Sequence, residues 1–298
     1  MEPLVSIITT THNIVEKGQA DDFNLLVTLL DMQTYPNVEH IVIDNASTDD
    51  TTVLLKDYKN KGYINFYSEP DSNKFDGYNK GIFRAKGKYI AFLSCDDFLH
   101  DITAIKDLVA LLENENADFS FSPSYCRHSE DFVFLFVPSM HNVFQVLPCP
   151  RQCMMFKKET LEKENGFDTR FKYMADFDLI IRLVMKQYKG VYFNRIYTTY
   201  KVGEQLSSTP SLGEHDAKLI FKKNYGSLYP LDDETLGRMV KISDFPQELL
   251  DQFVTRFPEA DKELFYQRCQ QMKEMRLMAL RQQQEQRQNQ EQQVNKEQ

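Results

Sequence analysis

The sequence of 298 residues predicts an α/β fold, in which helices flank a mostly parallel sheet and a C-terminal helical extension follows. Between Leu4 and about Ser122, short β-branched and apolar runs alternate with segments of helical periodicity, which is the pattern of consecutive strand–helix–strand units. Most of these runs are almost continuously apolar, as expected for strands that helices cover on both faces. From Asp261 onward the chain has the periodicity of one long helix.

The first 122 residues contain the predicted strands and the helices between them. The strands are Val5–Thr10, His40–Ile43, Ile64–Tyr67, Tyr89–Leu93 and Phe119–Ser122. Each intervening helix is predicted from an apolar face, and the four faces begin at Phe23, Val53, Tyr78 and Ile105. Ser47 and Asp50 have a capping spacing, so we expect both side chains to accept from free backbone N–H groups at the start of the second helix.

The regular alternation ends after Ser122. We expect a loop-rich stretch, a strand over Cys153–Phe156, a short helix after Lys158 and a helix over Ala175–Met185. The second half is therefore not another doubly wound domain.

The C-terminal helix has one apolar stripe that packing onto the parent domain explains better than a partner surface. The stripe consists of Phe265, Cys269, Met272, Met275 and Ala279. The Gln/Glu/Arg tract over residues 282–298 is almost wholly polar, and we expect it to fray in solution. The expected division is a main domain over 1–230, a helical extension over 231–281 and a disordered tail over 282–298.

Composition excludes several classes of protein. The chain has 35 basic and 44 acidic residues, and its formal net charge of −9 would repel nucleic-acid phosphates. The longest apolar run, Phe132–Val137, is much shorter than the ~20 residues of a membrane-spanning helix. The N-terminus has no signal-peptide features, so we expect a cytoplasmic protein. The five scattered cysteines favour reduced, buried thiols.

Polar clusters follow three of the predicted strands. They are Thr9–Asn13, Asp44–Asp49 and Ser94–Asp97. Because ligands of open parallel sheets bind beyond the carboxyl ends of the strands, these clusters predict a binding site at one edge. The glycines form no G-x-G fingerprint and no P-loop spacing, so a phosphate would be held in another way.

The adjacent Asp96 and Asp97 offer that alternative. Carboxylate oxygens bind Mg²⁺ or Mn²⁺, and these cations bind phosphate oxygens. In the competing interpretation, one carboxylate caps the helix that begins near Thr103 and the other is solvated. Two neighbouring negative charges are unfavourable without a counter-ion, which favours the metal.

Several segments, in this order and spacing, resemble family 2 glycosyltransferases. They are Val5–Asn13, Val42–Thr51, Ser68–Asp71, Asp76–Ile82, Gly87–Asp97, Gly166–Asp168 and Ala175–Asp178. The resemblance covers about Pro3–Tyr225 and implies a Rossmann-like GT-A fold with a nucleotide-binding half (1–122) and an acceptor-binding half (123–230). It also implies an inverting transferase that uses a nucleoside-diphosphate sugar, with UDP the favoured nucleotide, and Mn²⁺ or Mg²⁺.

The resemblance assigns residues to the donor site position by position. Strand ends would line the base and ribose pocket, and the third helix would approach the nucleotide or donor sugar. These residues are Thr10, His12, Asp44 and Asn45 at the strand ends, and Asp76, Asn79 and Lys80 on the helix. Asp97 would bind the metal and Asp96 the ribose or donor-sugar hydroxyls, although the reverse assignment stays open.

Asp176 matches the position of the family's catalytic base. Inversion by one in-line displacement requires a base for the acceptor hydroxyl, and a helix N-terminus favours an ionised carboxylate. In the competing interpretation Asp176 is only the N-cap of its helix. Asp178 and Arg182 have the spacing of a structural ion pair. Val202–Ser208 resembles the loop that folds over the donor. His215 is expected to be a surface residue, and a contact with the metal is the alternative that the resemblance leaves open.

The resemblance implies transfer of a single sugar to a saccharide or lipid-linked acceptor in surface polysaccharide biosynthesis. The chain has no tryptophan, so it lacks the Q-x-x-R-W element of processive synthases. Self-association through the C-terminal helix, and peripheral binding at the inner membrane face through Lys157–Lys158 and the Arg170–Lys172 region, are further hypotheses. The alternative functions are an inactive nucleotide-sugar-binding or scaffolding protein, and a nucleotidyltransferase, whose Gly-rich basic signature is absent.

Overall fold

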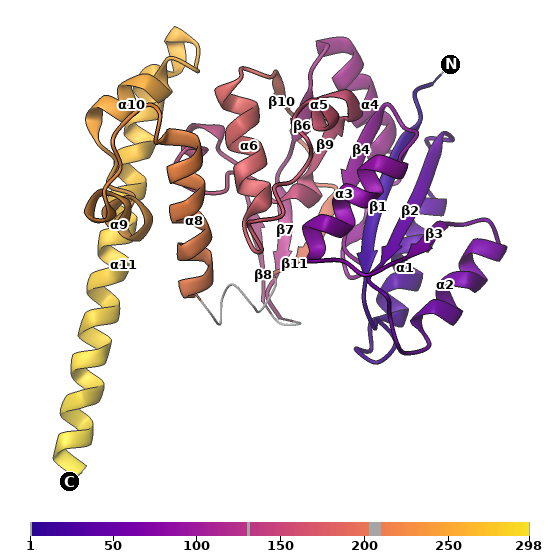
Figure 1. The fold of residues 1–298 in the computed structure, drawn as a ribbon, viewed down its shortest axis with the longest axis horizontal. Coiled ribbons are helices and arrows are strands. Elements are labelled where there is room, and N and C mark those ends of the chain that lie inside the picture. The colour runs from indigo at the N-terminus through magenta and orange to yellow at the C-terminus, as the bar shows by residue number, and fades with distance from the viewer. Residues whose placement is uncertain (1, 130–131, 203–209, 298) are drawn as a thin grey trace.

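The computed structural model has a seven-stranded sheet at its centre, with helices on both faces (Figure 1). It describes the backbone of residues 2–129, 132–202 and 210–297. The strand order is β10–β6–β9–β4–β1–β2–β3. The strands are β1 Val5–Thr11, β2 Val38–Asp44, β3 Asn65–Ser68, β4 Tyr89–Phe92, β6 Phe119–Phe121, β9 Met154–Lys157 and β10 Gly190–Tyr192. The predicted α/β fold with a mostly parallel sheet is confirmed.

Strand β9 runs antiparallel to both of its neighbours, β4 and β6, whereas the other pairs of this sheet are parallel. The sequence predicts a strand near Cys153–Phe156, but no local pattern predicts its place between β4 and β6.

β1 pairs with β2 in parallel, from Val5 opposite Val38 to Thr11 opposite Asp44. Because these strands are in register to their last residues, the polar clusters that follow them meet at one edge.

The helices divide between the two faces of the sheet (Figure 1). α3 (Lys74–Arg84), α5 (Lys158–Lys163) and α6 (Ala175–Met185) pack on one face, and α1 (Ala20–Asp31) and α4 (Ala104–Glu115) pack on the other. Gly81 lets α3 approach β1 closely, because a Cβ atom there would lie 2.4 Å from Ile8 Cγ2.

The predicted capping of the second helix, α2 (Thr51–Asn60), is wrong. Asp50 is the N-cap residue, but its side chain makes no capping hydrogen bond. The Ser47 hydroxyl donates instead to Asp44. The first turn is bonded by Asp49, whose Oδ1 accepts from Thr51 N–H at 3.0 Å. Ser47 therefore bonds the last residue of β2, three positions before it, in place of the start of α2.

A second, four-stranded sheet has the order β5–β11–β7–β8. Its strands are β5 Phe98–Leu99, β11 Thr198–Lys201, β7 Ser124–Arg127 and β8 Val133–Phe136. The 3₁₀ turns η1 (Met140–Asn142) and η2 (Arg151–Cys153) then lead the chain back to β9. The second half is indeed not a doubly wound domain, and the five cysteines are buried and unpaired as predicted.

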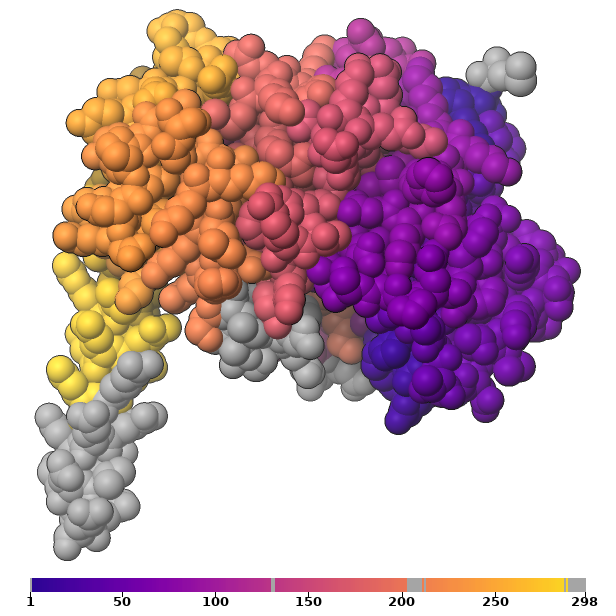
Figure 2. Space-filling model, in the orientation of Figure 1, coloured from indigo at the N-terminus to yellow at the C-terminus, as the bar shows by residue number. Residues whose placement is uncertain are grey.

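The C-terminal helices pack against the main domain through one apolar cluster that includes residues of the sheet. They are α8 Pro210–Tyr225, α9 Asp233–Ile242, α10 Gln247–Val254 and α11 Lys262–Glu297, with the 3₁₀ turn η3 at Glu259–Asp261. Phe144 stacks on Phe253 of α10 with ring centroids 4.2 Å apart. Figure 2 shows the orange helices lying flush against the main body, while the yellow part of α11 projects from it.

The predicted stripe of α11 is buried only in its first part. Phe265 and Cys269 are buried in the main cluster, whereas Met275 and Ala279 are exposed. Packing onto the parent domain is confirmed for the buried residues. The expectation is wrong for the other two, which are exposed although the neighbouring Arg276 still donates to the Val240 backbone oxygen of α9. The domain boundaries and the fraying of the tail remain predictions. No described helix is both long enough and apolar enough to cross a membrane.

Phe265→Ala should lower the free energy of unfolding by roughly 3–5 kcal/mol, because the buried ring packs against Phe257 and Phe144. Met275→Ala in the same helix should change it by at most about 0.5 kcal/mol, because Met275 is exposed. Urea unfolding measures both values. A loss no larger for Phe265→Ala than for Met275→Ala would contradict the packing of α11.

Candidate active site

The carboxyl ends of β1, β2 and β3 meet around the buried carboxylate of Asp44. Asp44 Oδ1 accepts from the hydroxyls of Thr11, at 3.1 Å, and of Ser47. Asp44 Oδ2 accepts from Ser47 N–H at 2.9 Å and from the Ser68 hydroxyl at 2.7 Å. Asp44 therefore ties three strand ends together and builds the edge of the sheet. Its contact with a nucleotide stays a prediction.

His12 and Asn45 lie side by side at this edge. His12 Nδ1 is 2.9 Å from the backbone oxygen of Asn45, and Asn45 Oδ1 accepts from Asp71 N–H at 2.7 Å. His12 is exposed, and Thr10 and Asn45 are half-buried. The structure thus brings together these three residues, predicted to line the base and ribose pocket, and leaves them accessible.

Helix α3 joins the same edge through Lys80. Lys80 Nζ lies 2.6 Å from Asp71 Oδ1 and 3.5 Å from Asp76 Oδ2. Burial raises the pKa of Asp71, and the ammonium of Lys80 counteracts that rise. Gly77 makes this close approach possible, because a Cβ atom there would lie 2.7 Å from Asp71 Oδ2 and 2.9 Å from Thr10 Cγ2.

Asn79 is engaged elsewhere. Its amide nitrogen donates to the Phe167 backbone oxygen at 2.8 Å, and its Oδ1 accepts from Phe167 N–H at 2.9 Å. Asn79 therefore holds the turn that precedes α6 against α3. Its predicted contact with the donor stays a prediction, and in this structure both ends of its amide are occupied.

Asp96 and Asp97 follow β4 and occupy different environments. Asp97 is buried, and its Oδ2 accepts from Ser94 N–H at 2.6 Å. Asp96 is partly exposed, and its Oδ2 lies 3.3 Å from Gln19 Nε2 and 3.9 Å from Lys201 Nζ. Neither caps α4, where Asp101 Oδ1 accepts from Thr103 N–H instead.

Asp97 Oδ1 fits a metal ligand. This buried oxygen has no hydrogen-bond partner among the described residues, which is unfavourable for a carboxylate unless another group satisfies it. Burial raises the pKa of Asp97 to about 6, and the charge of Arg151 offsets part of that rise. No group of three or more His, Cys, Asp or Glu side chains arranged as metal ligands occurs among the described residues. A cation bound to Asp97 would take its other ligands from phosphate oxygens and water, as Mg²⁺ commonly does.

Asp176 lies in the first turn of α6 with its side chain buried. Its Oδ1 accepts from Phe177 N–H at 3.0 Å. The N-cap interpretation is wrong, because the N-cap position is Met174. The N–H groups before the helix are bonded from outside by Asp216, whose Oδ2 accepts from Tyr173 and Met174. Asp176 is therefore not needed as the cap.

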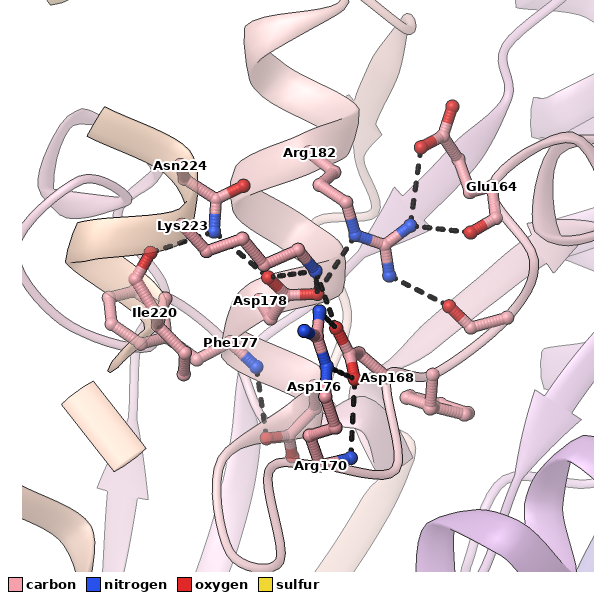
Figure 3. A network of polar contacts seen from close by, with 12 residues as sticks. Glu164, Asp168, Arg170, Asp176, Phe177, Asp178, Arg182, Ile220, Lys223 and Asn224 are labelled. Atoms are coloured by element: carbon pink, nitrogen blue, oxygen red, sulfur yellow. Dashed lines mark hydrogen bonds and ion pairs between the residues drawn. The ribbon is translucent and has the colours of Figure 1, made fainter. Parts of the chain in front are cut away.

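Asp178 belongs to a separate network on α6 (Figure 3). Its carboxylate lies 2.9 Å from Arg182 Nε and 2.8 Å from Lys223 Nζ, which confirms the predicted pair with Arg182. Lys223 also pairs with Asp168, and hydrogen bonds from Arg170 and Lys223 hold the pKa of Asp168 well below its usual range. Asp176 shares no bond with this network in Figure 3, so the two acidic residues have different roles.

Arg151, which sequence analysis did not identify, joins the two halves of the candidate site. Its Nη1 lies 3.6 Å from Asp176 Oδ2, and its Nη2 lies 3.4 Å from Ser94 Oγ. Because Ser94 N–H bonds Asp97, the structure brings Asp97 and Asp176 to the same side of the molecule. The available sequence signal was an arginine inside the otherwise uncharged, cysteine-rich segment Cys149–Cys153.

Two further predictions have different outcomes. The loop predicted over Val202–Ser208 lies outside the described residues from Gly203 onward. His215 is exposed on α8, as expected of a surface histidine.

The sheet edge with its clustered carboxylates, and α6 with a buried aspartate in its first turn, agree with the GT-A arrangement that the sequence resemblance implies. Residues 6–166 match the family model described as glycosyl transferase family 2, so the chain belongs to that family and is a glycosyltransferase.

The similar proteins include bacterial glycosyltransferases. The Escherichia coli enzyme WfaP, a UDP-Glc:alpha-D-GlcNAc-diphosphoundecaprenol beta-1,3-glucosyltransferase, is 29% identical over 67% of this chain and 77% of its own length. A putative teichuronic acid biosynthesis glycosyltransferase, TuaG of Bacillus subtilis, is 34% identical over 41% of this chain and 46% of its own length. One relative is thus named for a diphosphoundecaprenol-linked acceptor and the other for teichuronic acid biosynthesis.

Two solved structures share the fold. Staphylococcus aureus TarS 1–349 in complex with UDP-GlcNAc has a TM-score of 0.60 at 15% identity, covering 92% of this chain and 89% of that chain. The mannosyltransferase PcManGT of Pyrobaculum calidifontis, in complex with GDP-Man and Mn²⁺, has a TM-score of 0.60 at 16% identity, covering 93% and 85%. At these identities the likeness shows the GT-A fold.

Asp97→Asn should raise the melting temperature of the ligand-free protein at pH 7.5 by roughly 2–4 °C, the shift that about 1 kcal/mol produces in a large domain. The raised pKa of about 6 means that ionised Asp97 costs stability above that pH, whereas below it the wild-type carboxyl is neutral. The gain should therefore shrink towards pH 5. Thermal denaturation at both pH values measures it, with Asp96→Asn as control. A gain that is absent at pH 7.5, or equal at both values, would contradict the assignment.

Proposed function

We propose that this glycosyltransferase is metal-dependent and inverting, and that it moves one sugar from a UDP-sugar to a saccharide or lipid-linked acceptor in surface polysaccharide assembly. The observation that carries the proposal is the placement of Asp176 beside Arg151. Arg151 also contacts the turn that bears Asp97, whose Oδ1 has no hydrogen-bond partner in the described part of the chain. We propose that the donor sugar and the acceptor hydroxyl meet between these two carboxylates.

The edge formed by β1, β2 and α3 is proposed to bind the nucleotide. His12, Thr10 and Asn45 offer an exposed ring and two polar side chains to the base and ribose. Asp96, partly exposed beside Lys201, is proposed to accept from ribose or donor-sugar hydroxyls. Asp97 would hold Mn²⁺ or Mg²⁺, which would neutralise charge on the leaving diphosphate.

Asp176 is proposed to remove the proton of the acceptor hydroxyl as that oxygen attacks the anomeric carbon. Phe177 N–H occupies Oδ1, so Oδ2 is the oxygen assigned to the proton. Oδ2 can keep its contact with Arg151 because a carboxylate oxygen has two lone pairs. The nucleoside diphosphate leaves from the opposite face of the sugar, so the configuration of the anomeric carbon inverts.

The acceptor class is proposed from the relatives. WfaP is named for an acceptor on a diphosphoundecaprenol carrier, which supports a lipid-linked acceptor and a place on the cytoplasmic side of the membrane. Ion pairs at Lys157, Lys158 and Arg170 weaken the hypothesis that these residues bind the membrane surface. Lys157 and Lys158 lie within 4.0 Å of the carboxylates of Asp118 and Glu162, and Arg170 pairs with Asp168.

UDP with Mn²⁺ should raise the melting temperature of the wild-type protein more than UDP with EDTA does. Asp97→Ala should lose this metal-dependent increase, because the unpartnered carboxylate oxygen is gone. A thermal-shift screen of nucleotide sugars with and without Mn²⁺ measures both effects. Indifference to every nucleotide, or an unchanged metal effect in Asp97→Ala, would contradict the donor site.

Asp176→Asn should keep the UDP and Mn²⁺ effect but lower kcat by about 10²–10⁴-fold, the usual contribution of a positioned base. Release of UDP in the presence of acceptor measures kcat. Near wild-type transfer by Asp176→Asn would show that another group accepts the proton. Nucleotide binding without transfer by the wild-type protein, against every acceptor tested, would favour the inactive binding protein instead.

A further inference from the structure

Arg151 occupies an unusual position for a charged residue. It opens η2, and its side chain is only 9% exposed. Its guanidinium contacts three parts of the chain that are distant in sequence. Nη2 donates to the Tyr78 hydroxyl of α3 at 2.7 Å and lies 3.4 Å from Ser94 Oγ, while Nη1 lies 3.6 Å from Asp176 Oδ2.

The contacts of Arg151 differ from those of a structural ion pair. Arg182, on the same helix as Asp176, is held by Asp178, Glu164 and the Gly166 backbone oxygen. Arg151 instead has a longer contact with its carboxylate, and its Nε has no partner among the described residues. A buried ion pair of this kind adds little stability over apolar side chains, so its charge and shape call for another explanation.

The surroundings of Arg151 fix its orientation. The guanidinium carbon lies 4.8 Å from the centroid of the Tyr78 ring, and the hydroxyl of the same tyrosine accepts one N–H. Tyr78 is itself buried against Phe92 and Phe167. A planar guanidinium that lies over the Tyr78 ring and donates to the hydroxyl of the same residue presents its remaining N–H groups in set directions, which a lysine ammonium cannot do.

We propose that Arg151 is a positioning residue for sugar transfer, which holds the carboxylate of Asp176 in a fixed place relative to the Ser94–Asp97 turn. This inference rests on the proposed role of Asp176 as the base. Tyr78 fixes the guanidinium, Nη1 sets the direction of Asp176 Oδ2, and Nη2 reaches the turn that carries Asp97. Arg151 thereby couples the acceptor side of the site to the donor side.

The proposal predicts a separation of kcat from donor binding. Arg151→Met should lower kcat by about 10²-fold, because a misplaced catalytic group costs that much even when its chemistry is intact. In Arg151→Lys, which keeps the positive charge beside Asp97, the donor KM should stay within about threefold of the wild-type value and the UDP and Mn²⁺ thermal shift should persist. Arg151→Lys keeps the charge without the planar fork, so its kcat should lie between those of wild type and Arg151→Met.

Arg182→Lys is the matched control, because it changes a second buried arginine that pairs with an aspartate of α6. It should lower the melting temperature while kcat per folded molecule stays near the wild-type value. Should Arg151→Met fail to fold, Arg151→Lys carries the test alone, and an unchanged kcat in that variant would overturn the proposal. A rise in donor KM that accounts for the whole loss would also overturn it, because Arg151 would then bind the donor.

A double mutant separates this inference from the proposed function. In Asp176→Asn, the additional Arg151→Met change should lower kcat by less than about threefold, because the group that Arg151 positions is already absent. A full additional loss would show that Arg151 acts independently of Asp176. If Asp176→Asn alone is fully active, the proposed base is wrong, whereas full activity of Arg151→Met beside an inactive Asp176→Asn overturns only the role of Arg151.

Discussion

A carboxylate that is buried with one oxygen unpartnered is the constraint around which this site is organised. Asp97 Oδ2 is satisfied by the Ser94 N–H, but Oδ1 has no partner among the described residues. Burial of this charged oxygen costs free energy, which a bound cation or a proton can offset. The nearby positive charge of Arg151 lowers that cost without satisfying the oxygen. The folded protein therefore favours the binding of a cation or a proton at Asp97.

The rest of the architecture keeps that position fixed. Asp44 binds the ends of β1, β2 and β3 together, and Gly77 and Gly81 let α3 lie close to β1. On the acceptor side, Asp216 caps the start of α6 and leaves Asp176 free of that task. Arg151 then bridges the two sides from the 3₁₀ turn η2, which leads into β9 in the middle of the sheet.

The sequence predicts those features that depend on local periodicity and on the order of polar clusters. The predicted helix over Ala175–Met185 has the same bounds as the observed α6. The alternating pattern up to Ser122 predicts the parallel strands. The position of β9 and the contacts of Arg151 depend on residues far apart in the chain. No local pattern encodes such pairings, so the sequence misses them. Asn79 illustrates the same limit, because its occupied amide is visible only in the structure.

A crystal structure of the protein soaked with UDP and Mn²⁺ tests the central claim most directly. The anomalous signal of manganese should lie within bonding distance of an Asp97 oxygen, on the side of the sheet edge that faces Asp176, with diphosphate oxygens completing the coordination. Manganese bound elsewhere, with the Asp97 carboxylate still unpartnered beside bound UDP, would contradict the account.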